Sequence, residues 1–135
     1  MKVVVDTNVI LDILLRREPF FNASLNVIRN LRKEELYFSA TAATDIFYIL
    51  RKEAGIEVAK DSLGKIMQLL TCADAQQRDI LNGLASDMPD FEDAVLDAIA
   101  ARIKADYIVT KNVKDFSKSK VMAITPSDFI DKFRK

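Results

Sequence analysis

The chain has 135 residues, half of them apolar and 30% charged, and its 20 basic side chains balance 20 acidic ones. This length suits one domain, residues 1–135, that buries a core without disulfides. A zero net charge excludes the long-range attraction to nucleic acid that a positively charged domain has, so any RNA contact is expected from local patches.

Several classes of protein are excluded by what the sequence lacks. Uninterrupted apolar runs stay below the roughly 18 residues of a membrane span, so we expect neither a transmembrane helix nor a signal peptide. The single cysteine, Cys72, fits the reducing cytoplasm. The absence of histidine excludes serine triads and histidine zinc sites, and none of the three glycines lies at a strand-to-helix turn, which excludes a phosphate-binding loop.

Short apolar strands alternate with amphipathic helices along the chain. The β-branched run at residues 2–5 predicts a strand, and the spacing of apolar residues 9–14 predicts a helix directly after it. Thr125 and Pro126 form a helix-start signal. The other expected elements are helix 20–31, strand 36–39, helices 41–52 and 58–70, strand 71–73, helices 76–84 and 91–104, and strands 107–110 and 121–124.

This alternation predicts a doubly wound α/β fold, a parallel sheet covered by helices on both faces. Ligands of such sheets bind beyond the carboxyl ends of the strands. The residues expected there are Asp6 and Asn8 after the first strand, and Thr110, Lys111, Asn112 and Asp115 after the fourth.

Carboxylates are the side chains left to carry chemistry. Oxygen ligands without nitrogen or sulfur partners favour Mg²⁺ or Mn²⁺, and two such ions can promote hydrolysis of a phosphodiester. Asp6 is either a metal ligand or, like Asn8, the cap of the following helix. Asp93 and Asp97 share one face of a largely apolar helix, which indicates a bound cation, helix-start acids, or a partner such as Lys104.

Three further groups allow two interpretations each. Asp45 lies on an apolar helix and is either a ligand or a solvent-facing side chain beside Arg51 or Lys52. The stretch 110–115 supplies polar ligands or an ordinary turn. Aromatic residues are expected in the core or an interface, with nucleic-acid stacking as the alternative: Phe20, Phe21, Phe47, Tyr48, Phe129 and Phe133.

Three segments, KVVVDTNVILDIL, ATDIFYIL and DFEDAVLDAIAARIKADYIVTKNVKDF, resemble the successive signature blocks of the PIN-domain family over nearly the whole chain. The resemblance implies a three-layer α/β/α sandwich with a five-stranded parallel sheet and an Mg²⁺- or Mn²⁺-dependent nuclease centre acting on single-stranded RNA or a tRNA loop. Asp6, Asp45 and Asp93 would be the principal metal ligands and catalytic residues, supported by Thr7, Asn8, Asp97, Thr110, Asn112 and Asp115. Lys111 and Lys114 would contact the substrate.

The sequence departs from the family pattern at one acid. Many members carry an acid directly after the threonine and basic residue of the last block, where this chain has Asn112, and Asp115 follows three residues later. An amide oxygen is a weaker ligand than a carboxylate, so a second metal position is in question.

The chain also resembles the VapC-like ribonuclease toxins of toxin-antitoxin pairs in size. That resemblance implies a homodimer and an antitoxin partner, and apolar residues 9–15 and 47–50 are candidates for the dimer interface. Alternative hypotheses are a catalytically weak PIN-like module that binds RNA or protein, and a receiver-like or phosphatase-like Mg²⁺-binding domain. The phosphatase would need a second Asp where this chain has Asn8, and the receiver would need adjacent acids near the first strand.

Overall fold

A computed structural model describes residues 1–133, and its centre is a sheet of five parallel strands. The strands are β1 (Val3–Val5), β2 (Leu36–Ser39), β3 (Thr71–Ala73), β4 (Tyr107–Val109) and β5 (Met122–Ile124). All four pairings are parallel, and the strand order is β3-β2-β1-β4-β5. The predicted α/β fold with a five-stranded parallel sheet is confirmed.

Helices connect the strands at nearly the predicted positions. They are α1 (Thr7–Leu14), α2 (Phe21–Arg29), α3 (Ala40–Ala54), α4 (Ile56–Leu69), α5 (Gln77–Ala85), α6 (Phe91–Arg102) and α7 (Pro126–Phe133). Two short 3₁₀ turns, η1 (Lys33–Glu35) and η2 (Val113–Phe116), were not predicted. None of the described helices has the length and apolar character that crossing a membrane requires.

Local signals explain where several helices begin and end. The Ser39 hydroxyl accepts a hydrogen bond from the Ala42 amide and caps α3. At the other end of α3, Gly55 has a φ of 93°, a conformation that glycine adopts easily, and the chain turns there into α4. Thr125 caps α7 by accepting a hydrogen bond from the Asp128 amide at 3.1 Å, as its position before Pro126 predicted.

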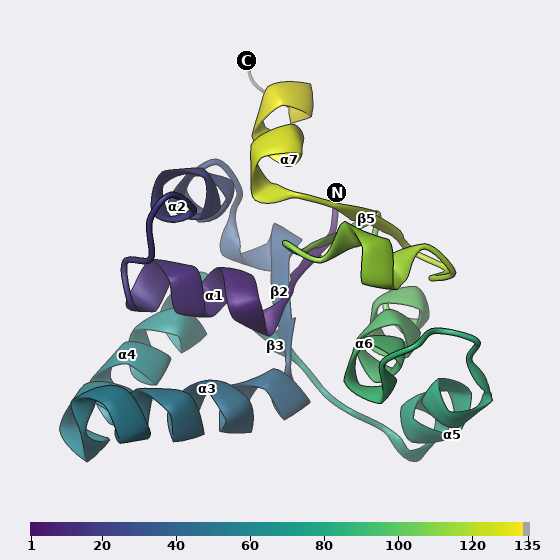
Figure 1. Ribbon diagram of the computed structural model, residues 1–135, viewed down its shortest axis with the longest axis horizontal. Helices are drawn as coiled ribbons and strands as arrows, with labels where there is room; N and C mark the ends of the chain where they lie inside the picture. The colour runs from purple at the N-terminus through teal and green to yellow at the C-terminus, as the bar shows by residue number, and fades with distance from the viewer. Residues whose placement is uncertain (134–135) are drawn as a thin grey trace.

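The sheet separates two apolar layers, as the alternation of side chains along β1 requires. Val3 and Val5 pack into the larger core with α1, α2, α3 and α4, whereas Val4 packs with α6 on the opposite face. Figure 1 shows α1 to α4 on one side of the strands and α5 and α6 on the other. The structure is the expected three-layer sandwich.

The strand order reverses direction at β1. From β1 the chain adds β2 and β3 on one side, then returns to place β4 and β5 on the other. The crevice between the carboxyl ends of β1 and β4 is therefore the expected ligand site of this sheet. The order also differs from the β2-β1-β3-β4-β5 order of flavodoxin-like receivers, so the receiver-like interpretation is wrong.

Two sequence-based expectations about apolar residues are corrected. The suggested interface residues Val9, Ile10 and Leu11 are buried in the core, because they form the face of α1 that packs on the sheet. Phe20 and Tyr48 were expected in the core or an interface; they are 43% and 66% exposed and so lie outside the core, and their place in an interface stays a prediction.

Candidate active site

Asp6 occupies the switch point between β1 and β4. It follows the last residue of β1, and its carboxylate accepts hydrogen bonds from the Thr7 amide at 2.8 Å and the Thr110 hydroxyl at 2.8 Å. Thr110 is fully buried and also accepts a hydrogen bond from the Asn112 amide. Asp6 is thus the N-cap of α1, and Thr110 fixes the orientation of its carboxylate.

The structure brings Asp6 into one pocket with the other principal acids. Asp45 reaches the pocket from α3, Asp93 from the first turn of α6, and Asp115 from the loop after β4. The pocket has a volume of about 480 Å³. It is also lined by Thr7, Asn8, Leu11, Tyr48, Ile49, Asp90, Glu92 and Asn112. We call it the acidic pocket.

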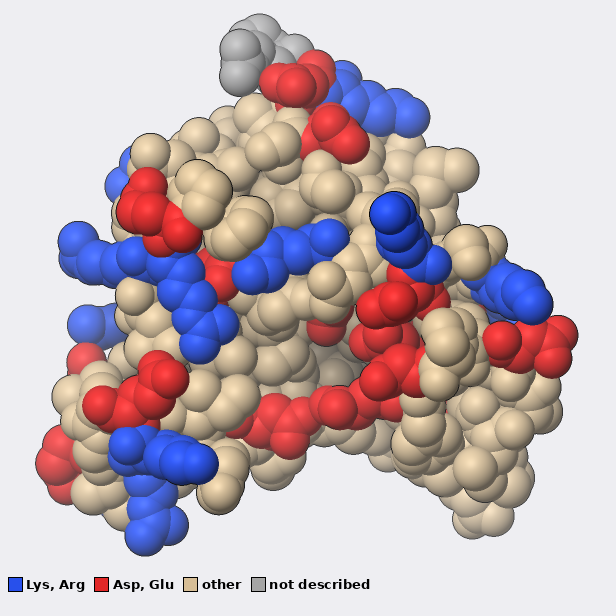
Figure 2. Space-filling model, viewed as in Figure 1, with Lys and Arg blue, Asp and Glu red and all other residues tan. Residues whose placement is uncertain are grey.

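Figure 2 shows the acidic side chains as a band around a hollow in this face, with Lys and Arg side chains on the same face above it. The pocket holds six carboxyl groups, those of Asp6, Asp45, Asp90, Glu92, Asp93 and Asp115. The molecule as a whole carries no net charge, yet acidic side chains gather at the carboxyl edge of its sheet. Such a concentration of carboxylates is typical of cation sites.

Asp90, Glu92 and Tyr48 were missed by the sequence interpretation as pocket residues. Asp90 and Glu92 lie at the start of α6, where acids are favoured by the helix dipole, and Asp90 caps α6 by accepting a hydrogen bond from the Asp93 amide at 3.0 Å. Tyr48 lies three residues after Asp45 on α3, and that spacing on one helix face could have indicated its place beside the acids.

The carboxyl groups of the acidic pocket raise one another's pKa values. A hydrogen bond with Asp45, together with burial and the neighbouring negative charges, raises the pKa of Glu92 from 4.5 to about 7. Burial and the charges of Asp6, Asp90 and Asp115 raise the pKa of Asp93 from 3.8 to about 7. Burial also raises the pKa of Asp6, against the opposing effect of its hydrogen bond from Thr110. The pocket therefore resists full ionisation without a counter-charge.

One buried oxygen in the acidic pocket has no partner. The side-chain oxygen of Asn8 makes no hydrogen bond although it is buried, and Asn8 lines the pocket. Among residues 1–133, no three Asp, Glu or Cys side chains converge closely enough to form a preassembled metal site. The carboxylates line the wall of the pocket, and ligation would draw them toward a common centre.

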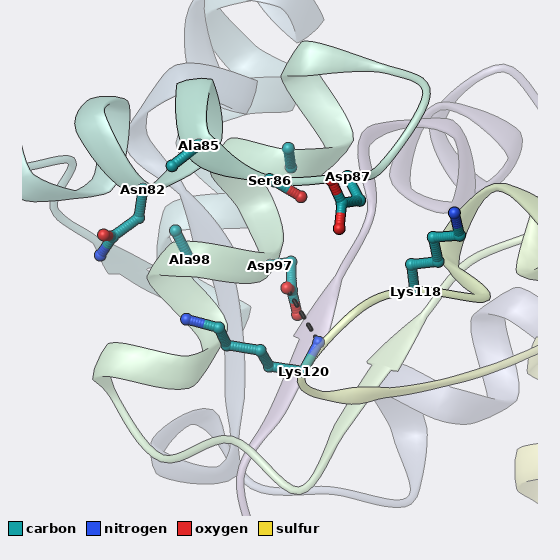
Figure 3. A pocket seen from close by; sticks show the side chains of 9 residues that line it. Asn82, Ala85, Ser86, Asp87, Asp97, Ala98, Lys118 and Lys120 are labelled. Carbon is teal, nitrogen blue, oxygen red and sulfur yellow. Dashed lines mark hydrogen bonds between the residues drawn. The ribbon is translucent and has the colours of Figure 1, made fainter.

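Asp97 lies apart from these acids and performs a different task. Its two carboxylate oxygens accept hydrogen bonds from the Lys120 and Val121 amides, each at 3.0 Å. Figure 3 shows Asp97 directed toward Lys120 in a separate pocket between α6 and the loop before β5. Both interpretations of Asp97 from the sequence, metal support and pairing with Lys104, are therefore corrected: it anchors that loop.

Lys111 is held by a buried acid that the sequence analysis did not consider. Its ammonium group lies 2.8 Å from a carboxylate oxygen of Asp12, which is completely buried on α1, and Arg17 approaches the same carboxylate at 3.7 Å. Lys111 is therefore held in position by α1. Lys114 is exposed in η2, next to Asp115.

Solved structures with the same fold come from toxin-antitoxin systems. VapBC2 from Rickettsia felis, bound to a DNA fragment from its promoter, superposes with a TM-score of 0.71 at 15% identity, covering 93% of this chain and 98% of that one. A toxin-antitoxin complex from Klebsiella pneumoniae gives a TM-score of 0.72 at 16% identity, with the same coverage of 93% and 98%.

A third structure is VapC20 from Mycobacterium tuberculosis, a sarcin-ricin loop cleaving toxin. It gives a TM-score of 0.67 at 10% identity and covers 79% of this chain and 87% of that one. At such identities these likenesses establish the shared fold.

Sequence comparison gives the family. No curated protein matches the sequence significantly. The family model described as the PIN domain matches residues 2–114, the segment that contains β1 to β4 and every residue of the acidic pocket except Asp115. The chain therefore belongs to the PIN-domain family.

Proposed function

We propose that this protein is a divalent-metal-dependent endoribonuclease that hydrolyses RNA phosphodiesters at the acidic pocket. The observation that carries the proposal is the convergence of six carboxyl groups from four segments of the chain at the β1/β4 switch point. Membership of the PIN-domain family and the fold shared with a toxin that cleaves the sarcin-ricin loop support a nuclease activity.

The donor set fits Mg²⁺ or Mn²⁺. All the candidate ligands are oxygen atoms, and the unpartnered Asn8 oxygen adds a neutral one. A cation would relieve the repulsion that raises the pKa of Glu92 and Asp93. We assign Asp6, Asp45 and Asp93 as principal ligands, with Asp115 and Asn112 in support. When bound, the ions supply an activated water and charge stabilisation at the phosphate.

The protein's own side chains position these ligands. Thr110 orients the Asp6 carboxylate through the 2.8 Å hydrogen bond, and the Thr7 amide holds its other oxygen. The exposed Lys114 ammonium group lies beside Asp115 in the sequence and can pair with an RNA phosphate at the pocket rim. Positioning groups of this kind keep the reacting phosphodiester aligned with the acids.

We further propose that this protein is the toxin of a toxin-antitoxin pair and acts in the cytoplasm on single-stranded RNA or a tRNA loop. The coverage of 98% of the Rickettsia and Klebsiella chains supports a toxin of similar extent with an antitoxin protein as its partner. A homodimer would bury apolar side chains that the single chain exposes, which include Tyr48 of the segment suggested from the sequence and Ile80, Leu81 and Leu84 on α5.

The alternative is a PIN-like module that binds RNA or protein and cuts weakly. It is favoured by the amide of Asn112 where many family members carry an acid, and by the separation of the carboxylates along the pocket wall. Asp115 opposes this alternative because it brings a carboxylate from the same loop into the pocket.

Cleavage of labelled single-stranded RNA with Mn²⁺, Mg²⁺ or EDTA tests the proposal. We expect wild type to cut with metal and to stop with EDTA, and Asp6→Asn to lose at least a hundred-fold in rate, since about 2.7 kcal/mol or more of stabilisation is a common loss for one catalytic group. Asp61→Asn, an exposed acid on α4 paired with Lys65, is the matched control and should cut like wild type. Equal cleavage by wild type and Asp6→Asn would indicate a contaminating nuclease. Metal binding without cleavage would favour the binding module.

A further inference from the structure

A second pocket adjoins the acidic pocket across the loop that follows β4. Its volume is about 380 Å³, within the range of roughly 300–1,000 Å³ typical of small-ligand sites. Lys111 lines this pocket, and the next residue, Asn112, lines the acidic pocket. The other walls come from the start of α2 and the start of α7, helices that pack side by side (Figure 1). We call it the Phe20 pocket.

The walls of the Phe20 pocket combine flat apolar surfaces with a few polar groups. The apolar side chains are Pro19, Phe20, Ala23 and Pro126. The Phe20 ring is 43% exposed although it is large and apolar, and the Lys111 ammonium group lies 4.1 Å from the ring centre. An exposed aromatic ring beside a cation is the arrangement on which nucleic-acid bases stack.

A buried hydroxyl group in this pocket lacks a partner. Ser24 has 0% exposed surface, and its hydroxyl oxygen makes no hydrogen bond although the side chain lines the pocket. A buried hydroxyl without a partner destabilises a fold, and a ligand that supplies one removes the cost. The polar edge of a base can both donate to and accept from such a hydroxyl.

Positive charge completes the pocket. Lys111 is held in place by Asp12, and Arg17 lies on the same carboxylate, so the three groups together carry one net positive charge. The first turn of α7 adds the positive end of a helix dipole at Ser127. The phosphate of a nucleotide whose base occupies the pocket would lie near both Lys111 and the N-terminus of α7.

We propose that the Phe20 pocket binds one unstacked nucleotide of single-stranded RNA next to the phosphodiester that the acidic pocket cuts. The base stacks on Phe20 and bonds the Ser24 hydroxyl, and its phosphate pairs with Lys111. This inference rests on the proposed function and adds to it a determinant of sequence preference. Single-stranded RNA is read by splaying out and stacking individual bases, which a pocket beside a cleavage site accomplishes.

Binding can be tested without metal and without cleavage, because the chain contains no tryptophan and a single reporter can be introduced. Phe20→Trp places an indole in the pocket, and stacking of a base on it quenches its fluorescence. We expect saturable quenching by short single-stranded RNA in EDTA, with one of the four homopolymers binding most tightly. Leu81→Trp, at a 56% exposed position on α5, is the control and should not respond. Absence of quenching, or equal quenching of both reporters, would overturn the proposal.

Ser24→Ala tests the assigned hydrogen bond. Because the hydroxyl has no partner, the variant should be at least as stable as wild type, and in the Phe20→Trp background it should weaken binding of the preferred homopolymer about five- to ten-fold, the effect of one hydrogen bond. Ser62→Ala on α4 is the matched control. Unchanged affinity in Ser24→Ala would contradict the role of Ser24.

Cleavage patterns separate this inference from the proposed function. If wild type cuts RNA, Phe20→Ala should change which nucleotide flanks the cut, and an unchanged pattern would overturn the pocket's role. If wild type cuts no RNA but Phe20→Trp is quenched saturably, the pocket stands and the proposed hydrolysis fails.

Discussion

At the scale of single residues, the acidic pocket depends on groups that never reach its surface. Asp6 is held by the buried hydroxyl of Thr110, which in turn accepts from the Asn112 amide. The end of β1 therefore presents a carboxylate, the proposed metal ligand, whose direction is fixed by the protein's own hydrogen bonds. Preorganisation of this kind is a requirement of precise metal sites.

Thr110→Val should expose this dependence. The substitution keeps the shape of the side chain but removes the donor to Asp6 and the acceptor for Asn112, so we expect a loss of about 1–3 kcal/mol in free energy of unfolding and a weaker metal affinity. The pKa of Asp6 should rise further, because the bond from Thr110 opposes the effect of burial. Urea denaturation and calorimetric metal titration measure both effects. Thr110→Ser should restore them, and a Thr110→Val protein with wild-type values would show that the bond is dispensable.

The raised pKa values of Glu92 and Asp93 give a pH dependence with a definite sign. Both rise to about 7, from 4.5 and 3.8, so the folded protein binds more protons than the unfolded chain between those limits. Stability contributed by the protonated acids is present at low pH and lost as the pH rises through about 7. In EDTA the Tm should therefore be higher at pH 5.5 than at pH 7.5.

Two comparisons identify the groups responsible for the expected fall in Tm between pH 5.5 and pH 7.5. Asp93→Asn should flatten it and raise the Tm at pH 7.5, whereas Asp61→Asn should leave it unchanged because Asp61 is exposed on α4. Saturating Mg²⁺ or Mn²⁺ should also flatten it, since bound cations favour the ionised acids. A Tm that rises between pH 5.5 and 7.5 in EDTA would contradict the assignment.

At the scale of elements, the period of apolar residues was sufficient to predict every helix and strand of the sheet. The strands are short β-branched or aromatic runs, and the helices carry a regular apolar face, so local sequence and tertiary packing agree. The two 3₁₀ turns were missed because they carry no such period. Capping was visible at Thr125 and Asp6, where short polar side chains precede a helix.

The spacing of apolar residues does not predict which side chains from different elements contact each other. Asp93 and Asp97 share a helix face, yet Asp93 reaches the acidic pocket and Asp97 bonds the amides of residues 120 and 121. The two loop residues that bind Asp97 lie 23 and 24 residues after it in the sequence, so no local pattern around Asp97 could indicate them. Lys111 likewise pairs with Asp12, a residue whose burial no local pattern indicated.

Asp97→Asn tests the structural role assigned to that residue. An amide presents one acceptor oxygen and an NH₂ group, so one of the two loop amides loses its partner and faces a donor. We expect destabilisation of about 1–3 kcal/mol with metal affinity unchanged. Urea denaturation and calorimetric titration with Mn²⁺ distinguish this outcome from that of Asp93→Asn, which should weaken metal binding. Loss of metal affinity in a fully folded Asp97→Asn protein would return Asp97 to the metal site.

At the scale of the whole molecule, the surface combines the acidic pocket with apolar side chains that the core does not use. On α5, Ile80, Leu81 and Leu84 are 38%, 56% and 68% exposed, and positions 80, 81 and 84 share one face of the helix. Phe91, 49% exposed at the start of α6, lies close to Gly83 of the same helix pair. We propose that these exposed apolar side chains form the interface of the homodimer.

The proposed homodimer should therefore depend on α5. Leu84→Lys places a charge in the centre of that face, where burial against a second copy would require its desolvation, so we expect the dimer to dissociate. The fold should keep its stability, because the Leu84 side chain is already 68% exposed. Light scattering coupled to size-exclusion chromatography gives the mass, and Met122→Lys on β5, at a 64% exposed position, is the matched control and should remain dimeric. A wild-type mass of one 15.2 kDa chain would refute the homodimer, and a Leu84→Lys protein that stays dimeric would move the interface to another apolar face, such as that of Met67 and Leu69 on α4.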